Sequence, residues 1–189
     1  MLENKGSIKA SPGGKAIRVV KAYSQHDSTF KLANFGAIDG DIEIGYDLNS
    51  AILNIYDGSN LVNGTVNSNI ALSERTINFI DYGSNQNKVT NFSSNITGSW
   101  NVFVGEGADV LLSGRNSYIG ETLIEGGNLT IGGAKALSDF SDITIKKGMN
   151  GKGMLDLNSK TVKTNTITLN SGEITGTALD ILNGSARIK

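Results

Sequence analysis

Short apolar–x–apolar triplets recur along this chain at a nearly constant spacing, and this recurrence restricts the possible folds more than any other feature. The second apolar residues of one series are separated by 23, 24, 25, 20, 21 and 24 residues. A period in the twenties is typical of solenoids, in which each coil of the chain stacks on the previous one. The residues of this series are Leu32, Ile55, Phe79, Val104, Ile124, Ile145 and Leu169.

A second series shares the period but lags behind the first, which indicates more than one strand per coil. It consists of Leu112, Ile131, Leu157 and Ile181, with gaps of 19, 26 and 24. The frame that leucine-rich repeats require is absent. Alternation of apolar and polar residues predicts strands that pair in parallel with the equivalent strands of neighbouring coils. We therefore predict an all-β parallel solenoid of about seven to eight coils, with Ile145 facing the core and Thr144 facing solvent.

Glycine and asparagine gather between the triplets, where the chain must turn. We expect glycine to supply positive φ at these corners. The glycines concerned are Gly105, Gly107, Gly126, Gly127, Gly148 and Gly172. Asparagine tolerates the same backbone and can form hydrogen-bonded ladders between coils. The residues concerned are Asn49, Asn63, Asn85, Asn116, Asn158 and Asn170. The Gly-rich segment 148–153 is interpreted as a widened corner, and 134–140 is the best helical candidate, at one or two turns.

Composition agrees with one solenoid over residues 1–189. The chain has 24 glycines, one proline and no cysteine, so no disulfide staples it and stability must come from core area and strand ladders. A net charge of −1 gives no electrostatic reason to expect nucleic acid or an anionic membrane as partner. No signal peptide and no apolar run long enough to span a bilayer is present. We interpret the chain as an internal segment of a longer protein, with an irregular end at residues 1–14.

The stretch from Leu112 to Gly132 carries a denser motif, with an Asn-x-Tyr-x-Gly step, a Gly-Gly turn and three short strand-like runs. This motif resembles the passenger-associated repeat of Gram-negative autotransporter proteins, and the resemblance extends from about Ile96 to Asn158. The matching positions are Leu112, Gly114, Asn116, Tyr118, Gly120, Thr122, Ile124, Gly126, Gly127, Leu129, Ile131 and Gly132. Trp100 departs from the family pattern, since it stands where glycine is common.

The resemblance implies a right-handed parallel β-helix in a passenger that is exported by type V secretion. Such a passenger crosses the periplasm and is carried through the outer membrane by a C-terminal barrel of the same precursor, which is not in this chain. It is then secreted or displayed at the cell surface. The repeat carries no catalytic residues, so the resemblance assigns none here.

Few groups in the sequence suggest chemistry, and we predict no catalytic residue, no metal site and no cofactor. The lone histidine, His26, precedes Asp27, and a polar corner explains this pair better than a general base does. Asp39, Asp41 and Glu43 alternate and are expected to face outward on one strand. A calcium site or a pair of glycosidase carboxylates is conceivable there, but a solvated face is the favoured interpretation.

Two aromatic residues, Tyr82 and Trp100, are the candidates for exposed contacts with a partner. We predict a passenger segment without enzymatic activity, an adhesin or effector scaffold that binds a host-cell surface protein or glycan. The alternatives are a polysaccharide-active β-helix enzyme, which needs clustered Asp with Lys or Arg on one face, and the binding subunit of a toxin. End-to-end self-association is also expected, because a fragment of a solenoid leaves open strand edges.

Overall fold

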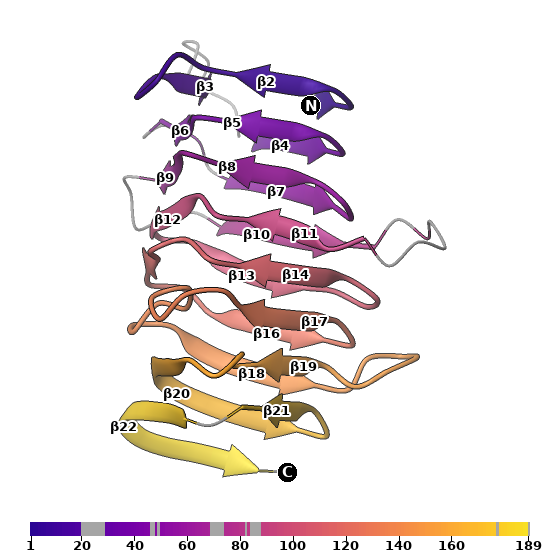
Figure 1. The fold of residues 1–189 in the computed structure, drawn as a ribbon, viewed down its shortest axis with the longest axis vertical. Helices are drawn as coiled ribbons and strands as arrows, with labels where there is room; N and C mark the ends of the chain where they lie inside the picture. The colour runs from indigo at the N-terminus through magenta and orange to yellow at the C-terminus, as the bar shows by residue number, and fades with distance from the viewer. Residues whose placement is uncertain are drawn as a thin grey trace.

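Figure 1 shows a computed structural model of the chain, a rod of stacked strands with the N-terminus at one end and the C-terminus at the other. The structure describes residues 1–19, 29–45, 48, 50–68, 74–81, 83, 88–176 and 178–188. Strands and turns make up these residues, and no helix occurs among them. The helical candidate 134–140 is a pair of turns. The all-β prediction is therefore confirmed for the described part of the chain.

The strands form three sheets that run along the rod. The first sheet has nine strands: β1 (Leu2–Asn4), β4 (Thr29–Asn34), β7 (Ser50–Tyr56), β10 (Glu74–Ile80), β13 (Asn101–Val104), β16 (Thr122–Glu125), β18 (Asp142–Lys146), β20 (Thr161–Asn170) and β22 (Ala178–Ile188). The second sheet has eight: β2 (Ser7–Lys9), β5 (Ala37–Asp39), β8 (Asn60–Val62), β11 (Thr90–Phe92), β14 (Asp109–Leu112), β17 (Asn128–Ile131), β19 (Met154–Asp156) and β21 (Glu173–Thr175). The third sheet has five: β3 (Lys15–Val19), β6 (Asp41–Ile44), β9 (Thr65–Ser68), β12 (Asn95–Gly98) and β15 (Ser117–Tyr118).

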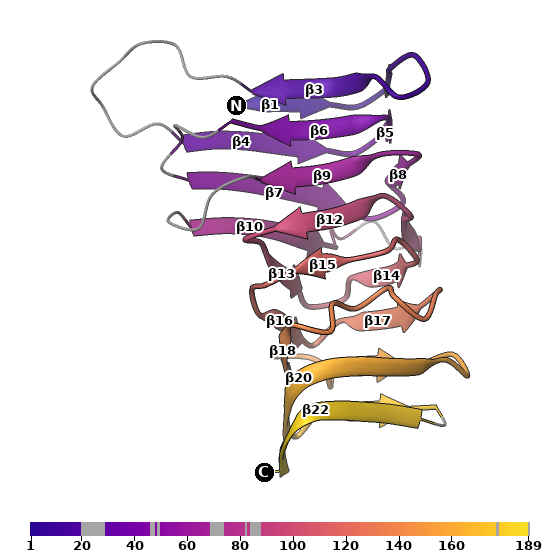
Figure 2. The same cartoon turned by 90° about the vertical axis from the view of Figure 1, so that its left-hand side faces the viewer.

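Each named strand pairs in parallel with the equivalent strand of the next coil, as in β10 with β7 and β13. This arrangement confirms the parallel β-solenoid (Figures 1 and 2). The right-handed sense and the number of coils stay predictions. Residues 1–14, expected as an irregular end, contain β1 and β2, which pair with β4 and β5.

The first apolar series is one row of the first sheet over most of its length. From Ile55 to Leu169, each residue of the series is the register partner of the next. Leu32 is the exception, because it pairs with Leu53, and Asn34 occupies the place beside Ile55. Asn34 is fully buried and accepts a hydrogen bond of 2.7 Å from the amide of Asn4. A hydrogen-bonded pair of amides thus replaces an apolar residue in this row. Because no apolar residue marks this position, the spacing of apolar residues did not indicate the register of β4 with β7.

The second series is confirmed in part. Leu112 and Ile131 are register partners in the second sheet, as predicted. Ile181 lies elsewhere, because it belongs to β22 and pairs with Thr164 of β20. Its assignment to the second series was wrong. An apolar residue at the expected spacing can lie in the first sheet or in the second. The number of residues in the preceding turn decides which of the two sheets it joins.

Alternate residues of each strand face a narrow core. In β7 every second side chain is buried, and in β18 Ile145 is fully buried while Thr144 is half-buried. The predicted facing of Ile145 and Thr144 is therefore confirmed. Phe79 of the first sheet meets Phe92 of the second edge-to-face, with ring centroids 5.5 Å apart. Contacts of this kind join the inner faces of the sheets into one core.

The corner glycines serve two different purposes. Gly107 and Gly126 have φ near 71°, as predicted. Gly127 lacks a positive φ, but a Cβ atom there would lie 2.2 Å from the backbone oxygen of Gly105. It is required because two coils approach too closely for a side chain. The prediction of positive φ is wrong for four of the named glycines, Gly105, Gly127, Gly148 and Gly172.

Candidate functional site

The third sheet presents two rows of polar side chains to solvent, and these rows form the candidate site. They alternate with buried residues, as Asp41 and Glu43 do with Ile42 and Ile44. Because the strands are in parallel register, one residue from each coil joins each row. One row is Arg18, Glu43, Asn67 and Thr97, and the other is Lys15, Asp41 and Thr65. We call these seven residues the polar face.

Contacts within the polar face fix many of its side chains. The carboxylate of Glu43 forms ion pairs with Lys15 and with Arg18, whose Nε lies 3.6 Å away. Asp41 Oδ1 accepts a 2.8 Å hydrogen bond from the backbone N–H of Thr65. These side chains are half-buried or exposed, so the ion pairs add little to stability after screening by solvent. Their main effect is to hold donors and acceptors in place.

A shallow cavity of about 300 Å³ lies on this face. It is lined by residues of three successive coils: Lys15, Asp41, Ile42, Glu43, Thr65 and Asn67. Among the described residues of the lining, Ile42 alone has an apolar side chain, and that side chain is buried in the core. The cavity therefore offers charged, hydroxyl and amide groups to a ligand rather than an apolar surface.

The predicted acidic cluster is divided between two strands. Asp41 and Glu43 share β6, but Asp39 ends β5 in the second sheet, beyond the corner at Gly40. Gly40 has φ of 125°, a conformation that favours glycine. Asp39 lies 3.7 Å from Lys9 Nζ and accepts a hydrogen bond from the amide of Asn63. The expectation of three carboxylates on one strand was therefore wrong.

The motif that resembles the passenger-associated repeat lies where the third sheet ends. Leu112, Leu129 and Ile131 are fully buried in the second sheet. Its glycines mark close approaches between coils, and at both Gly114 and Gly120 a Cβ atom would lie 2.1 Å from a backbone oxygen of the preceding coil. The motif residues thus have structural roles in the core and at the corners.

Asn116 of this motif connects neighbouring coils. Its Oδ1 accepts a 2.8 Å hydrogen bond from the backbone N–H of Ile96, and its Nδ2 donates to the carbonyl of Ala136. Its own N–H donates to the carbonyl of Lys135 at 2.8 Å. Asn116 therefore joins the last two strands of the third sheet to the segment 132–141, which takes the place of a strand in the next coil.

Tyr118, Thr122 and Ser141 form a buried chain of hydroxyl groups beside Asn116. Tyr118 Oη lies 2.7 Å from Thr122 Oγ1, which lies 2.8 Å from Ser141 Oγ, and Ser141 donates to the carbonyl of Gly120. Burial raises the pKa of the Tyr118 hydroxyl, and hydrogen bonds to Thr122, Ser141 and the backbone of Ser138 oppose that rise. This arrangement leaves Tyr118 neutral and is structural in character.

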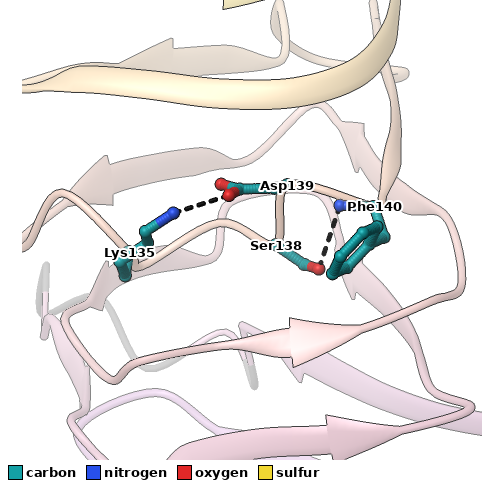
Figure 3. Close-up of polar contacts among 4 residues, drawn as sticks. All are labelled: Lys135, Ser138, Asp139 and Phe140. Carbon is teal, nitrogen blue, oxygen red and sulfur yellow. Dashed lines mark hydrogen bonds and ion pairs between the residues drawn. The ribbon is translucent and has the colours of Figure 1, made fainter. Parts of the chain in front are cut away.

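The segment 132–141 also displays an aromatic side chain (Figure 3). Lys135 Nζ lies 2.5 Å from a carboxylate oxygen of Asp139, and the hydroxyl of buried Ser138 accepts a hydrogen bond from the N–H of Phe140. Phe140 is 64% exposed, and Ile119 is 60% exposed. The side chains of these two residues were not singled out from the sequence, because nothing in a triplet pattern distinguishes an exposed apolar residue from a buried one.

The two aromatic contact candidates have different outcomes. Trp100 is fully buried in the core, so its prediction as an exposed contact was wrong. It comes directly before β13, and the alternation of that strand turns it inward with Val102. Tyr82 lies outside the described residues, and so do His26 and Asp27.

Within the described residues, no group of three or more His, Cys, Asp or Glu side chains is placed to hold a metal ion. The described part of the chain also has no helix of the length and apolarity needed to cross a membrane. Comparison of the chain with protein-family models, with curated proteins and with solved structures finds no match. The resemblance to autotransporter passengers therefore stays a prediction.

Proposed function

We propose that this chain is a display segment, a rod that carries a binding surface on its outer side. The observation that supports the proposal is the separation of roles along each strand of the third sheet. Ile42 and Ile44 are 1% exposed and hold the core, while Asp41 and Glu43, which alternate with them along β6, line the cavity. Outward residues can then vary without disturbing the core, as suits a binding scaffold.

We further propose that the rod belongs to a passenger that is secreted or displayed at a bacterial surface and meets a host-cell protein or glycan. The motif from Leu112 to Gly132 supports this proposal through its resemblance to the passenger-associated repeat. A C-terminal outer-membrane barrel of the same precursor would be the export partner. Adhesion or presentation of an effector would then be the activity of the whole protein.

Saturable binding to cultured host cells tests the proposal. The purified 189-residue chain is labelled and titrated onto intact cells, with a heat-unfolded sample of the same chain as control. We expect binding that saturates and that unlabelled chain displaces. Binding that rises linearly with concentration, or that the unfolded sample reproduces, would contradict a specific contact surface.

A polysaccharide-active enzyme is the second candidate, and one observation favours it. Such an enzyme needs acidic groups together with Lys or Arg on one face, and the polar face places Lys15 and Arg18 beside Glu43. The three residues are up to 28 positions apart in sequence, so only the stacking of coils brings them together. Release of reducing ends from a panel of polysaccharides would establish this activity, and release that survives Glu43→Gln would place it elsewhere.

A further inference from the structure

The polar face points to a particular class of ligand. We infer that it binds an uncharged glycan chain that lies along the axis of the rod, across β3, β6, β9 and β12. This inference rests on the proposed function, because it names the ligand of the same surface. It follows from the spacing of the two rows, from the chemistry of the cavity and from the balance of charge.

The spacing suits an extended polymer. Each row presents one side chain per coil, and neighbouring coils are about 4.8 Å apart, so the row from Arg18 to Thr97 extends over about 14 Å. The residues of this row are register partners from strand to strand. A ligand that follows the axis therefore meets polar groups at regular intervals on consecutive coils.

The chemistry of the face suits hydroxyl groups. Carboxylates accept hydrogen bonds, ammonium and guanidinium groups donate them, and threonine and asparagine do both. Protein interfaces are anchored by buried aromatic or aliphatic side chains, and the large apolar side chains exposed in the described chain all lie outside the cavity lining. They are Met1, Leu2, Val89, Ile119, Phe140 and Met149. A polyhydroxylated ligand uses what the face offers, whereas an apolar segment of a protein does not.

The charges select an uncharged glycan over an acidic one. The polar face has two basic residues, Lys15 and Arg18, and both are already paired with Glu43. Its two acidic residues, Asp41 and Glu43, both line the cavity. A uronate or sulfate group entering the cavity would approach these carboxylates, and among the described residues both cations of the polar face are already engaged by Glu43. Hydroxyl groups meet no such repulsion.

The fixed geometry adds to the case. Asn67 accepts a 3.1 Å hydrogen bond from Thr97 Oγ1, and Asp41 is held by the N–H of Thr65. Side chains that are already ordered lose little conformational freedom when a ligand binds. The face is therefore organised before its ligand arrives.

A glycan array with two matched variants tests the inference. The array carries uncharged oligosaccharides of glucose, galactose, mannose and N-acetylglucosamine, and polygalacturonate, hyaluronan and heparin as the acidic set. The variants are Asn67→Ala on the polar face and Asn78→Ala on the first sheet. Asn78 donates a 2.9 Å hydrogen bond to Asn54 of the neighbouring coil, so each variant loses one part-buried contact between coils.

We expect the chain to bind at least one uncharged oligosaccharide and no acidic polymer. Asn67→Ala should weaken that binding at least about tenfold, as the loss of a buried polar contact does, while Asn78→Ala leaves it unchanged. Glu43→Gln removes one negative charge and leaves both cations. It should therefore weaken binding of the uncharged oligosaccharide and introduce binding to heparin. Equal melting temperatures of Asn67→Ala and Asn78→Ala would show that lost folding is not the cause.

Three results would overturn the inference. The first is binding of acidic polymers alone by the unmodified chain, and the second is equal loss of glycan binding in Asn67→Ala and Asn78→Ala. The third is undiminished binding to host cells whose surface glycans have been removed enzymatically. That third result would assign the face to a protein partner and leave the proposed function standing. Absence of saturable binding to intact cells, in contrast, would remove the proposed function itself.

Discussion

The first sheet runs through every coil of the rod, whereas the third sheet stops at Tyr118 (Figure 2). In the first sheet an inward row from Ile55 to Leu169 is apolar throughout. On the side of the rod where the third sheet ends, the segment 132–141 occupies the place of a strand. In the coils that follow, this place is occupied by the paired N-terminal parts of β20 and β22. The first sheet thus carries the fold, and the third side is free to vary in structure and in surface chemistry.

The end of the third sheet is held by polar contacts instead of strand pairing. Asn116 and the hydroxyl chain of Tyr118, Thr122 and Ser141 supply hydrogen bonds that a further strand would otherwise provide. Buried polar groups are costly unless they are fully paired, so such a junction depends on precise geometry. We therefore expect substitutions in the first sheet and substitutions at this junction to lower the stability of the chain by different amounts.

The largest effect is expected in the first sheet. Ile145→Asp places a charge without a partner in a narrow apolar core and should destabilise the chain by at least about 4 kcal/mol, with loss of several coils. Thr144→Asp, one residue away on the outward side, should be mild. Urea unfolding followed by circular dichroism measures both, and similar losses for the two variants would refute the assigned facing.

A smaller loss is expected at the corner that follows the third sheet. In Gly120→Ala the new Cβ would lie 2.1 Å from the carbonyl oxygen of Trp100, so the coils must move apart. Overpacking of this kind costs about 1–3 kcal/mol. Gly6→Ala is the control, because nothing lies within 4 Å of its added Cβ. If both variants melt at the same temperature, close approach of coils is not what requires glycine at position 120.

A pH-dependent effect is expected at Tyr118. Burial raises its pKa in the folded chain, so its contribution to stability is present below the unfolded value of about 10 and is lost as pH rises through the folded value. Tyr118→Phe removes this titration along with the hydrogen bond to Thr122, at a cost of about 1 kcal/mol at neutral pH. Melting temperatures between pH 8 and pH 11, chosen to span the unfolded pKa of about 10, should therefore fall less steeply in Tyr118→Phe. Parallel curves for the two proteins would show that Tyr118 ionises as freely in the fold as outside it.

Sequence periodicity predicted the solenoid and most of the first sheet because apolar residues recur at inward positions. It failed where a polar residue faces the core. Asn34 occupies the position beside Ile55 that the sequence pattern assigned to Leu32. Arg75 occupies an inward position at 1% exposure, and its register partner is the small residue Ala51. Burial lowers the pKa of the Arg75 guanidinium. Alternation alone does not mark such residues, because their burial depends on neighbours from other coils.

The candidate site was predicted only in its acidic half. Asp41 and Glu43 stood out because they alternate, but Lys15 and Arg18 are brought beside them by parallel pairing of β3 with β6. That pairing includes a register shift between Lys15 and Ile17, and spacing in the sequence does not indicate a shift of this kind. Asn67 and Thr65 likewise became relevant only once their coil was stacked on β6.

A pair of double variants gives the most direct test of the proposed binding surface. The outward polar face of the third sheet should bind host cells, whereas a comparable hydrogen-bonded ladder on the first sheet should not. Asn67→Ala with Thr97→Ala removes one hydrogen-bonded pair from the third sheet, and Asn54→Ala with Asn78→Ala removes one from the first. Both should lower the melting temperature by a similar amount, about 2–4 °C for each kcal/mol lost. We predict that binding to cultured host cells is lost in the first double variant and retained in the second. Equal binding by both, or loss in the second alone, would contradict the account.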